Sequence, residues 1–495
     1  MSKHKLLVAN RSEIACRVFQ AAYELGIPTV AIYAPGDEGA RHVTMADEIA
    51  AVPGYLDVSA IIEVSKSLGV TLIHPGYGFL SERPHFAKAV EEAGIHFLGP
   101  LAETMEAMGG KIAAKEIAEK IGVPTVPWAK LDLLKSSPAE LKLAAEKVGF
   151  PILIKAHAGG GGKGMRRVDR IEDLKEQAEA ASREAISSFG DGTLFFERYV
   201  QSPRHIEVQV FGDGKGNGVH LFERECSLQR RHQKVWEEAP APFLSESIRK
   251  GLFESAMKLV EYTKYRSAGT IEYLVDSVNG EAKDFFFIEM NTRLQVEHPV
   301  TESITGIDLV HEQIKLAIQK TYTLPVLEKP IGHAIEVRVY AEDPAQEFIP
   351  CTGTVDHLIW ASGPGIRVDR GVEVGQVMGT SFDSMCAKLI AIGQNREVAV
   401  KRMQYILRET VISGIGTNLE YLNEIAHHPK VVEGKVTTHF LDKEFQKFSP
   451  SLSRSELDMI SAFEASDAFR PGSATTGGAF AERADSTSIW SSNPV

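Results

Sequence analysis

The chain has 495 residues, of which 43% are hydrophobic and 24% are charged, and both values are ordinary for a globular protein. This length exceeds that of one typical domain, so two to four domains are expected. The formal net charge is -12 and the sequence has no long Lys/Arg block, which argues against nucleic acid or an anionic membrane as the main partner.

The cysteines and the short apolar runs predict a cytoplasmic location. The four cysteines form no CxxC pair, so neither a zinc knuckle nor a disulfide framework is indicated, and a reducing compartment fits best. No stretch approaches the roughly 18 apolar residues of a membrane span. The apolar run near the start is too short for a signal peptide. We therefore expect no membrane partner.

Residues 1–110 have the pattern of a parallel α/β domain, in which strands are separated by helical segments. The strand and helix segments are, in order, KLLVA (5–9), EIACRVFQAAYELG (13–26), PTVAIYAP (28–35), TLIHPGYG (71–78) and IHFLGP (95–100). The first loop, ANRSE, lacks the GxGxxG pattern, so the sequence gives little support for a dinucleotide site.

Three further parts are expected after a boundary at the start of the predicted helix KIAAKEIAEKIG. Residues 111–330 form the part that carries most of the candidate chemistry. Residues 331–446 combine short strands with a helix near 397–409. Residues 447–495 are rich in Ser, Gly and Thr and are predicted to be a flexible tail.

A glycine-rich segment follows an apolar strand in PILIKAHAGGGGKGMRRV, residues 151–168. Glycine lets backbone N–H groups approach an oxyanion closely, and Lys155 and Lys163 would neutralise it. The segment is not a P-loop, because its spacing and its lack of Ser or Thr do not fit. It is therefore interpreted as a flap over a triphosphate, and the alternative is a flexible hairpin turn.

Two charged segments come next. FFERYV (195–200) could supply an edge segment for adenine through Glu197 and the backbone near Val200. ERECSLQRRHQKVWEEAPAP (223–242) crowds basic side chains together, either as a solvated face or as an anion site. Its basic residues are Arg224, Arg230, Arg231, His232 and Lys234.

Polar residues alternate in FIEMNTRLQVEHPVTE, residues 287–302. In an extended strand, alternate side chains share a face, so the polar set would line one side. That set is Glu289, Asn291, Arg293, Gln295 and Glu297. With Glu272 on a second apolar strand, Glu289 and Asn291 could hold Mg²⁺. The alternative is an amphipathic edge strand with a solvated face.

Five motifs together resemble the biotin carboxylase component of the biotin-dependent carboxylases, an ATP-grasp enzyme, over about residues 3–446. They are HPGYGFLSE (74–82), GGGGKGM, PRHIEVQ, RRHQKVWEEAPAP and FIEMNTRLQVEHPVTE. The resemblance implies an α/β fold with an N-terminal parallel domain, a central ATP-grasp domain with a glycine-rich flap, and a C-terminal mixed α+β domain.

The resemblance also implies a reaction. ATP would phosphorylate bicarbonate to carboxyphosphate, and the carboxyl group would pass to N1′ of biotin on a carrier protein. The cofactors would be ATP and Mg²⁺, with Mn²⁺ as an alternative. No Met-Lys-Met biotinylation motif occurs in the sequence, so we expect the carrier to be a separate polypeptide.

Site residues are carried over position by position. The nucleotide contacts fall on Lys111, Lys155, Gly161, Gly162, Glu197, Val200, His205 and His232. The metal ligands fall on Glu272, Glu289 and Asn291. The bicarbonate contacts fall on Lys234, Arg293, Gln295 and the Val296 amide. Glu297 would be the base for bicarbonate, and Arg338 would stabilise the biotin enolate.

Several questions stay open at this level. The acceptor could be acetyl-CoA, in fatty-acid synthesis, or that of a split pyruvate or acyl-CoA carboxylase. The expected partners are a biotin carboxyl carrier protein, carboxyltransferase subunits and a second copy of the chain. Alternative functions are another ATP-grasp ligase that traps an acyl phosphate with an amine, and a catalytically silent ATP-binding regulator.

Overall fold

The computed structural model describes residues 3–131, 136–157, 165–231, 233–278 and 281–449. The N-terminal part is a five-stranded sheet of order β3-β2-β1-β4-β5, and each neighbouring pair is parallel. Its strands are β1 (Leu6–Val8), β2 (Thr29–Tyr33), β3 (Glu48–Ala51), β4 (Leu72–His74) and β5 (His96–Phe97). Its helices are α1 (Ser12–Glu24), α2 (Arg41–Met45), α3 (Val58–Ser67), α4 (Pro84–Glu92) and α5 (Ala102–Gly109). The predicted parallel α/β pattern is confirmed.

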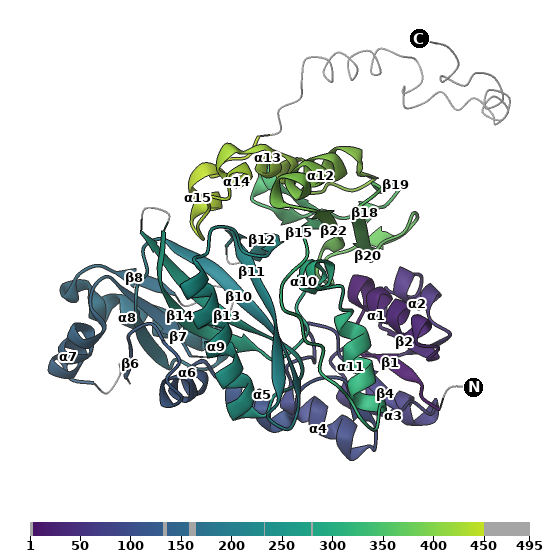
Figure 1. Ribbon diagram of the computed structural model, residues 1–495, viewed down its shortest axis with the longest axis horizontal. Coiled ribbons are helices and arrows are strands. Elements are labelled where there is room, and N and C mark those ends of the chain that lie inside the picture. The colour runs from purple at the N-terminus through teal and green to yellow at the C-terminus, as the bar shows by residue number, and fades with distance from the viewer. Residues whose placement is uncertain (1–2, 132–135, 158–164, 232, 279–280, 450–495) are drawn as a thin grey trace, which may run out of the picture. The chain divides into compact units, whose positions relative to one another are not determined.

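The helix predicted to begin at residue 111 is α6 (Lys111–Lys120), and the central part also contains a four-stranded antiparallel sheet of order β6-β9-β7-β8. Its strands are β6 (Trp128–Leu131), β7 (Ile152–Ala156), β8 (Arg166–Val168) and β9 (Leu194–Arg198). Helices α7 (Pro138–Val148) and α8 (Ile171–Phe189) pack apolar residues such as Ala145 and Ala181 against this sheet (Figure 1). The predicted glycine flap lies between β7 and β8 in the sequence, and residues 158–164 are outside the described residues.

An eight-stranded antiparallel sheet of order β14-β13-β10-β11-β12-β15-β22-β20 crosses the predicted boundary at residue 330. The strands from the central part are β10 (Pro203–Asp213), β11 (Gly218–Arg230), β12 (Gln233–Ala239), β13 (Arg266–Val278) and β14 (Glu281–Asn291). The others are β15 (His333–Tyr340), β20 (Ile366–Arg370) and β22 (Met385–Gly393). Residues that are far apart in sequence therefore share one continuous sheet.

Helices cover both faces of this sheet. α9 (Glu246–Thr263) packs on β10, β11 and β14, whereas α10 (His298–Thr305) packs on β11, β12, β15 and β22. α11 (Leu309–Ile318) joins the core formed with α1 of the N-terminal part. On β15, Ile335 and Val337 belong to the core that includes α12 (Arg396–Glu409). Because strand residues alternate between faces, Glu336 and Arg338 point to the opposite side.

The remaining elements lie in the third part (Figure 1). Its helices are α13 (Leu419–His427), α14 (Pro429–Val432), α15 (Phe440–Glu444) and the 3₁₀ turn η1 (Pro344–Gln346). Its short strands are β16 (Glu342–Asp343), β17 (Ile349–Pro350), β18 (Gly353–Thr354), β19 (His357–Ile359), β21 (Val377–Met378) and β23 (Val411–Ser413). The mixed α+β character predicted for this part is confirmed. The predicted tail lies outside the described residues from 450 onward.

The predicted alternation along residues 289–297 is only partly correct. β14 ends at Asn291, so Arg293, Gln295 and Glu297 lie in the loop that follows and not on the strand. A β-bulge also shifts the register, because Glu272 faces Glu289 while the next residue of β13 faces Phe287. An extra residue of this kind moves the face on which the following side chains lie. A bulge in β14 and the loop after it, not a regular strand, therefore bring the polar side chains of residues 289–297 together.

The bulge makes Phe287 a core residue. Its side chain is buried in the cluster formed with α9, and its ring lies 6.3 Å from that of Tyr273. Phe287→Ala should lower the apparent free energy of unfolding by about 3 to 5 kcal/mol, because it leaves a cavity in a packed core. Phe286→Ala changes the same side chain at a half-buried position and serves as the control. Equal losses in chemical unfolding of the two variants would contradict this register.

Candidate active site

Two carboxylates and an amide meet where β13 and β14 pair. Glu272 and Glu289 are directly opposite each other, and Asn291 Nδ2 donates to Glu272 Oε1 at 2.9 Å. Burial and the nearby Glu272 carboxylate raise the pKa of Glu289. Burial opposes ionisation of Glu272 too, but Lys234 and His205 lower its pKa below the ordinary value. Adjacent carboxylates with an amide oxygen are a donor set that fits a divalent cation such as Mg²⁺.

A second group of predicted residues surrounds Glu197 on β9. This carboxylate is buried and forms ion pairs with Lys155 of β7 and Lys115 of α6, the latter at 2.5 Å. Burial alone would raise the pKa of Glu197, but the two ammonium groups lower it to about 2. Burial lowers the pKa of Lys111, which begins α6. Sequence reasoning missed Lys115, although it is one helical turn from Lys111.

The other predicted nucleotide residues divide into described and undescribed positions. Val200 is buried in the short connection between β9 and β10, and His205 Nε2 lies 3.0 Å from Glu272 Oε2. Burial opposes protonation of His205, but Glu272 outweighs it and raises the pKa of the imidazole. This contact joins the predicted nucleotide and metal residues. The predicted contacts Gly161, Gly162 and His232 lie outside the described residues.

Lys234 of β12 is the meeting point of three carboxylates. Its Nζ lies 2.5 Å from Glu207 Oε2, 2.9 Å from Glu272 Oε1 and 2.6 Å from Glu297 Oε1. Burial opposes its charge, but Glu207 and then Glu272 and Glu297 raise the pKa of Lys234 well above the usual value. The ammonium group is therefore charged and uses all three of its donors. Glu207 was not predicted as a site residue.

Glu297 is held between two cations from different strands. Its Oε1 accepts from Lys234, and its Oε2 lies 2.9 Å from Nη2 of Arg338 on β15. The same Arg338 nitrogen lies 2.6 Å from Glu237 Oε1. Burial would raise the pKa of Glu297, but Lys234 and Arg338 lower it well below the ordinary value. Glu297 is thus ionised in this arrangement.

Residues 292–297, which we call the substrate loop, connect β14 to α10. Arg293 donates to Glu82 Oε2 at 3.0 Å, to Gln295 Oε1 at 3.0 Å and to Asn291 Oδ1 at 3.2 Å. The Thr292 amide donates to the other Glu82 oxygen at 3.0 Å. Glu82 belongs to the N-terminal part, so this loop is held by a residue outside the central sheet. Sequence reasoning quoted Glu82 within HPGYGFLSE without giving it a role.

The described members of the predicted basic cluster on β11 and β12 do not gather at one place. Arg224 is fully buried and donates to Glu207 at 2.5 Å. Arg230 donates to Glu342 at 3.0 Å, and the exposed Arg231 donates to Glu347 at 3.2 Å. Because neighbouring strand residues point to opposite faces, the cluster is dispersed. Of the described members, Lys234 reaches the candidate site directly, and Arg224 contacts it through Glu207.

A further pair of acids lies beside Arg338. Glu336 of β15 and Glu237 of β12 are direct cross-strand partners, and both are fully buried. Neither oxygen of Glu336 has a hydrogen-bond partner among the described residues. Burial raises the pKa of Glu336 well above its ordinary value, and it raises the pKa of Glu237 to about 7 against the opposing effect of Arg338. Burial therefore favours the protonated form of Glu336.

This protonation has a measurable consequence. Folded Glu336 keeps its proton to higher pH than it does in the unfolded chain. Its contribution to the free energy of unfolding is therefore complete when the pH is below its ordinary pKa of 4.5, and it is lost as the pH rises towards the pKa in the folded protein. Glu336→Gln mimics the protonated acid, so its melting temperature should fall less than that of the wild type between about pH 5 and about pH 8. Melting curves across this range provide the measurement.

Glu223→Gln is the matched control, because Glu223 is equally buried but is paired with Arg249 at 2.9 Å on the other face of the sheet. This variant should keep the pH slope of the wild type. Parallel pH profiles for Glu336→Gln and the wild type would contradict a raised pKa of Glu336.

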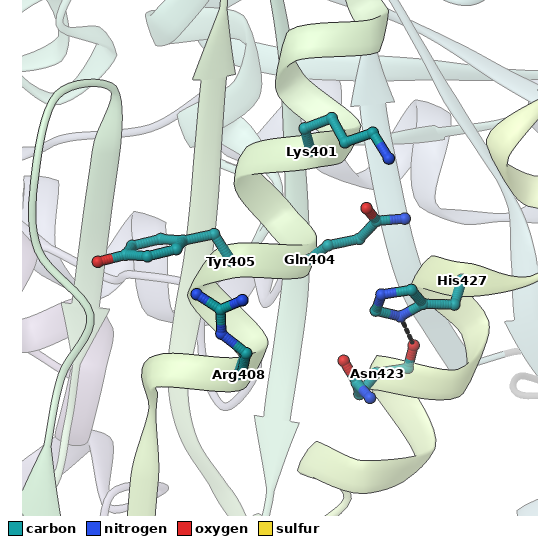
Figure 2. Close-up of a pocket in the computed structure, with 6 residues that line it drawn as sticks. All are labelled: Lys401, Gln404, Tyr405, Arg408, Asn423 and His427. Atoms are coloured by element: carbon teal, nitrogen blue, oxygen red, sulfur yellow. Dashed lines mark hydrogen bonds between the residues drawn. The ribbon is translucent and has the colours of Figure 1, made fainter.

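A surface hollow of about 400 Å³ lies away from these residues, between α12 and α13 (Figure 2). It is lined by Lys401, Gln404, Tyr405, Arg408, Asn423 and His427. Gln404 and His427 both hydrogen-bond to backbone carbonyls of α13. None of the lining residues belongs to the predicted site, which is distributed along the sheet and not in this hollow.

The central part defines an ATP-grasp enzyme. Residues 110–326 match the family model described as carbamoyl-phosphate synthase L chain, ATP binding domain. The flanking parts are more specific, because residues 2–105 match the biotin carboxylase N-terminal domain and residues 336–443 match the biotin carboxylase C-terminal domain. The chain belongs to the biotin carboxylase family.

Individual relatives agree with this assignment. The chain is 45% identical over 444 residues to a biotin carboxylase of Halalkalibacterium halodurans, covering 88% of this chain and 97% of that protein. It is 46% identical over 447 residues to the mitochondrial methylcrotonoyl-CoA carboxylase subunit alpha of Dictyostelium discoideum, covering 88% of this chain. It spans only 63% of the length of that subunit.

A solved structure has the same fold. The biotin carboxylase domain dimer of the Hydrogenobacter thermophilus 2-oxoglutarate carboxylase, in complex with MgADP, ADP and bicarbonate, matches with a TM-score of 0.84 and 42% identity. The match covers 90% of this chain and 99% of that chain. Among the described residues, no helix is both long and apolar enough to cross a membrane. The predicted cytoplasmic location stays a prediction.

Proposed function

We propose that this chain carboxylates biotin with bicarbonate and ATP through carboxyphosphate, as an ADP-forming ligase. The observation that carries the proposal is Glu297, a buried carboxylate held by Lys234 and Arg338 beside the Glu272 and Glu289 pair. Phosphoryl transfer depends mainly on positioning and charge neutralisation, and bicarbonate is a poor nucleophile until its proton is removed. This site combines a candidate base, two cations and a cation-binding carboxylate pair.

ATP would lie between the four-stranded sheet and the carboxylate pair. Lys155, whose ammonium is paired with Glu197, would bind phosphate, and His205 would hydrogen-bond the nucleotide. Glu272, Glu289 and Asn291 would hold Mg²⁺, or Mn²⁺ in its place. When bound, the metal ion would neutralise negative charge on the phosphates. The raised pKa of Glu289 supports this assignment, because a cation would relieve the repulsion between the two carboxylates.

Bicarbonate would bind at the substrate loop, to Arg293, Gln295 and the Val296 amide, with Lys234 opposite. The donors of Lys234 are already occupied by carboxylates, so the substrate must compete for them. When Lys234 turns towards bicarbonate, Glu297 loses a cation and its pKa rises. Glu297 then becomes the better base, because an effective general base has a pKa near the working pH.

Arg338 would act in the second half-reaction. Its guanidinium would stabilise the negative charge that develops on the ureido oxygen when biotin N1′ loses its proton. Protonation of Glu297 by bicarbonate removes the charge of one carboxylate bound by Arg338, which leaves the guanidinium freer to meet this new charge. Proton transfer in the first step thereby prepares the second.

The final acceptor and the partners belong to the same proposal. The Dictyostelium discoideum relative is a methylcrotonoyl-CoA carboxylase subunit, so the comparison favours an acyl-CoA acceptor of that kind over the acetyl-CoA of fatty-acid synthesis. We expect a biotin carboxyl carrier protein and carboxyltransferase subunits to complete the reaction. A homodimer is expected, because the Hydrogenobacter thermophilus domain is described as a dimer.

The test of this function is the dependence of ATP hydrolysis on its co-substrates. The purified chain should hydrolyse ATP slowly without bicarbonate and faster with it, and free biotin should increase the rate further and yield carboxybiotin. Hydrolysis at full rate without bicarbonate would exclude the carboxyphosphate route. Because the central family model is that of a carbamoyl-phosphate synthase, stimulation by an amine without any effect of biotin would favour the other ATP-grasp ligase.

The proposed base gives a sharper test. Glu297→Gln keeps the shape but cannot accept the bicarbonate proton, so bicarbonate-dependent ATP hydrolysis should fall by about 10²-fold or more. Glu223→Gln removes a buried, paired carboxylate on the other face of the sheet and should retain activity. Steady-state ADP release measures both variants. Near-normal activity of Glu297→Gln would mean that another group or a water molecule takes the proton.

A further inference from the structure

Lys388 of β22 is a fully buried lysine that touches the substrate loop. Its Nζ donates to the Val296 carbonyl oxygen at 2.9 Å and lies 3.1 Å from Glu13 Oε1 and 3.7 Å from Asp369 Oδ2. Glu13 comes from α1 of the N-terminal part, and Asp369 comes from β20. One ammonium group therefore joins the N-terminal helix, the substrate loop and the third part of the chain.

Lys388 is charged in this setting. Burial opposes its charge, but the carboxylates of Glu13 and Asp369 raise its pKa, with Arg367 opposing them. His298 at the start of α10 also lies near, and burial with Lys388 keeps the pKa of that imidazole well below its usual value. A buried ion pair adds little net stability compared with apolar residues of similar volume. The position of this ammonium group consequently calls for a reason beyond stability.

The bonded carbonyl supplies that reason. The carbonyl of Val296 belongs to the peptide group that joins Val296 to Glu297, and a peptide group is planar. A hydrogen bond to this oxygen therefore fixes the backbone from which the Glu297 side chain extends. At the other end of the substrate loop, Glu82 accepts from the Thr292 amide and from Arg293. The loop is thus held at both ends by residues from outside the central part.

We propose that Lys388 is a positioning residue for bicarbonate. It holds the Val296 to Glu297 peptide group, so that the Val296 amide on one side of residue 296 and the Glu297 carboxylate on the other face the same substrate. This inference rests on the proposed function for the identity of the substrate. The positioning role itself is independent of the proposed function, because the contact between Lys388 and Val296 holds the loop whatever the substrate is.

The test uses two variants of the full chain. Lys388→Met keeps the length of the side chain but loses the donor, and it leaves Glu13 without its cation. The double variant Lys388→Met with Glu13→Gln removes both charges, and the amide oxygen at position 13 can still accept from the Tyr77 hydroxyl. Asp369 keeps its paired contacts with Arg367. The double variant therefore avoids an unpaired buried charge if the single variant folds poorly.

Kinetics provide the first measurement. Loss of the donor should raise KM for bicarbonate by about 10- to 100-fold, because small displacements of a positioned group have effects of this size. KM for ATP should stay within about twofold, since the groups around Glu197 are untouched. An equal rise in KM for both substrates, or an unchanged KM for bicarbonate, would overturn the proposal.

Arg396→Met is the matched control for lost stability. Arg396 pairs with buried Glu238 at 2.7 Å and donates to the backbone carbonyls of Val431 and Val432, and it touches no part of the substrate loop. This variant should lower the melting temperature without changing KM for bicarbonate. A rise in KM equal to that of Lys388→Met would show a general effect of destabilisation and overturn the proposal.

Hydrogen exchange separates this inference from the proposed function. Amides of residues 293–297 should exchange about tenfold faster or more in the double variant than in the wild type, with β10 and β13 unchanged, because the loop has lost the hydrogen bond from Lys388 to the Val296 carbonyl. This measurement needs no turnover. If the wild type lacks bicarbonate-dependent hydrolysis, the proposed function fails, while wild-type exchange in the loop of the double variant would refute the role of Lys388.

Discussion

The site depends on the buried ammonium of Lys234, which neutralises carboxylates from three elements at once. Glu207 extends from β10, Glu272 from β13, and Glu297 from the end of the substrate loop. Removing one partner from such a buried group costs several kcal/mol, because it leaves an uncompensated charge. The carboxylates could not stand this close together without that cation. Its position on β12, near the middle of the eight-stranded sheet, holds them at one place.

The continuity of the sheet places the second cation. β15 is hydrogen-bonded to β12 in the sheet, so Arg338 lies beside Glu237 and reaches Glu297. Arg338 and Glu297 are 41 residues apart in the sequence. Apolar residues on the other face of β15 pack into the core with α12. One strand therefore anchors the third part of the chain and supplies a charged group to the site of the central part.

The ionic layer extends from Arg338 across the face covered by α10. Lys388 is the cross-strand partner of Arg338, and Asp369 is the partner of Lys388 on β20. Glu336 lies in the same layer without a hydrogen-bond partner among the described residues, and burial raises its pKa. Charges in this layer compensate one another over three strands, so substrate binding that draws a cation away from one carboxylate changes the proton affinity of its neighbours.

Local patterns in the sequence predicted the parallel α/β character of the N-terminal part and proposed Glu272 as a partner of Glu289, because the periodicities of strands and helices depend on neighbouring residues. The motifs determined the family. Only the tertiary structure decided that Arg224 donates to Glu207, that Arg293 donates to Glu82, and that Lys388 donates to the Val296 carbonyl. Such contacts join residues distant in sequence, and no local periodicity encodes which of many similar charges will meet when separate elements pack together.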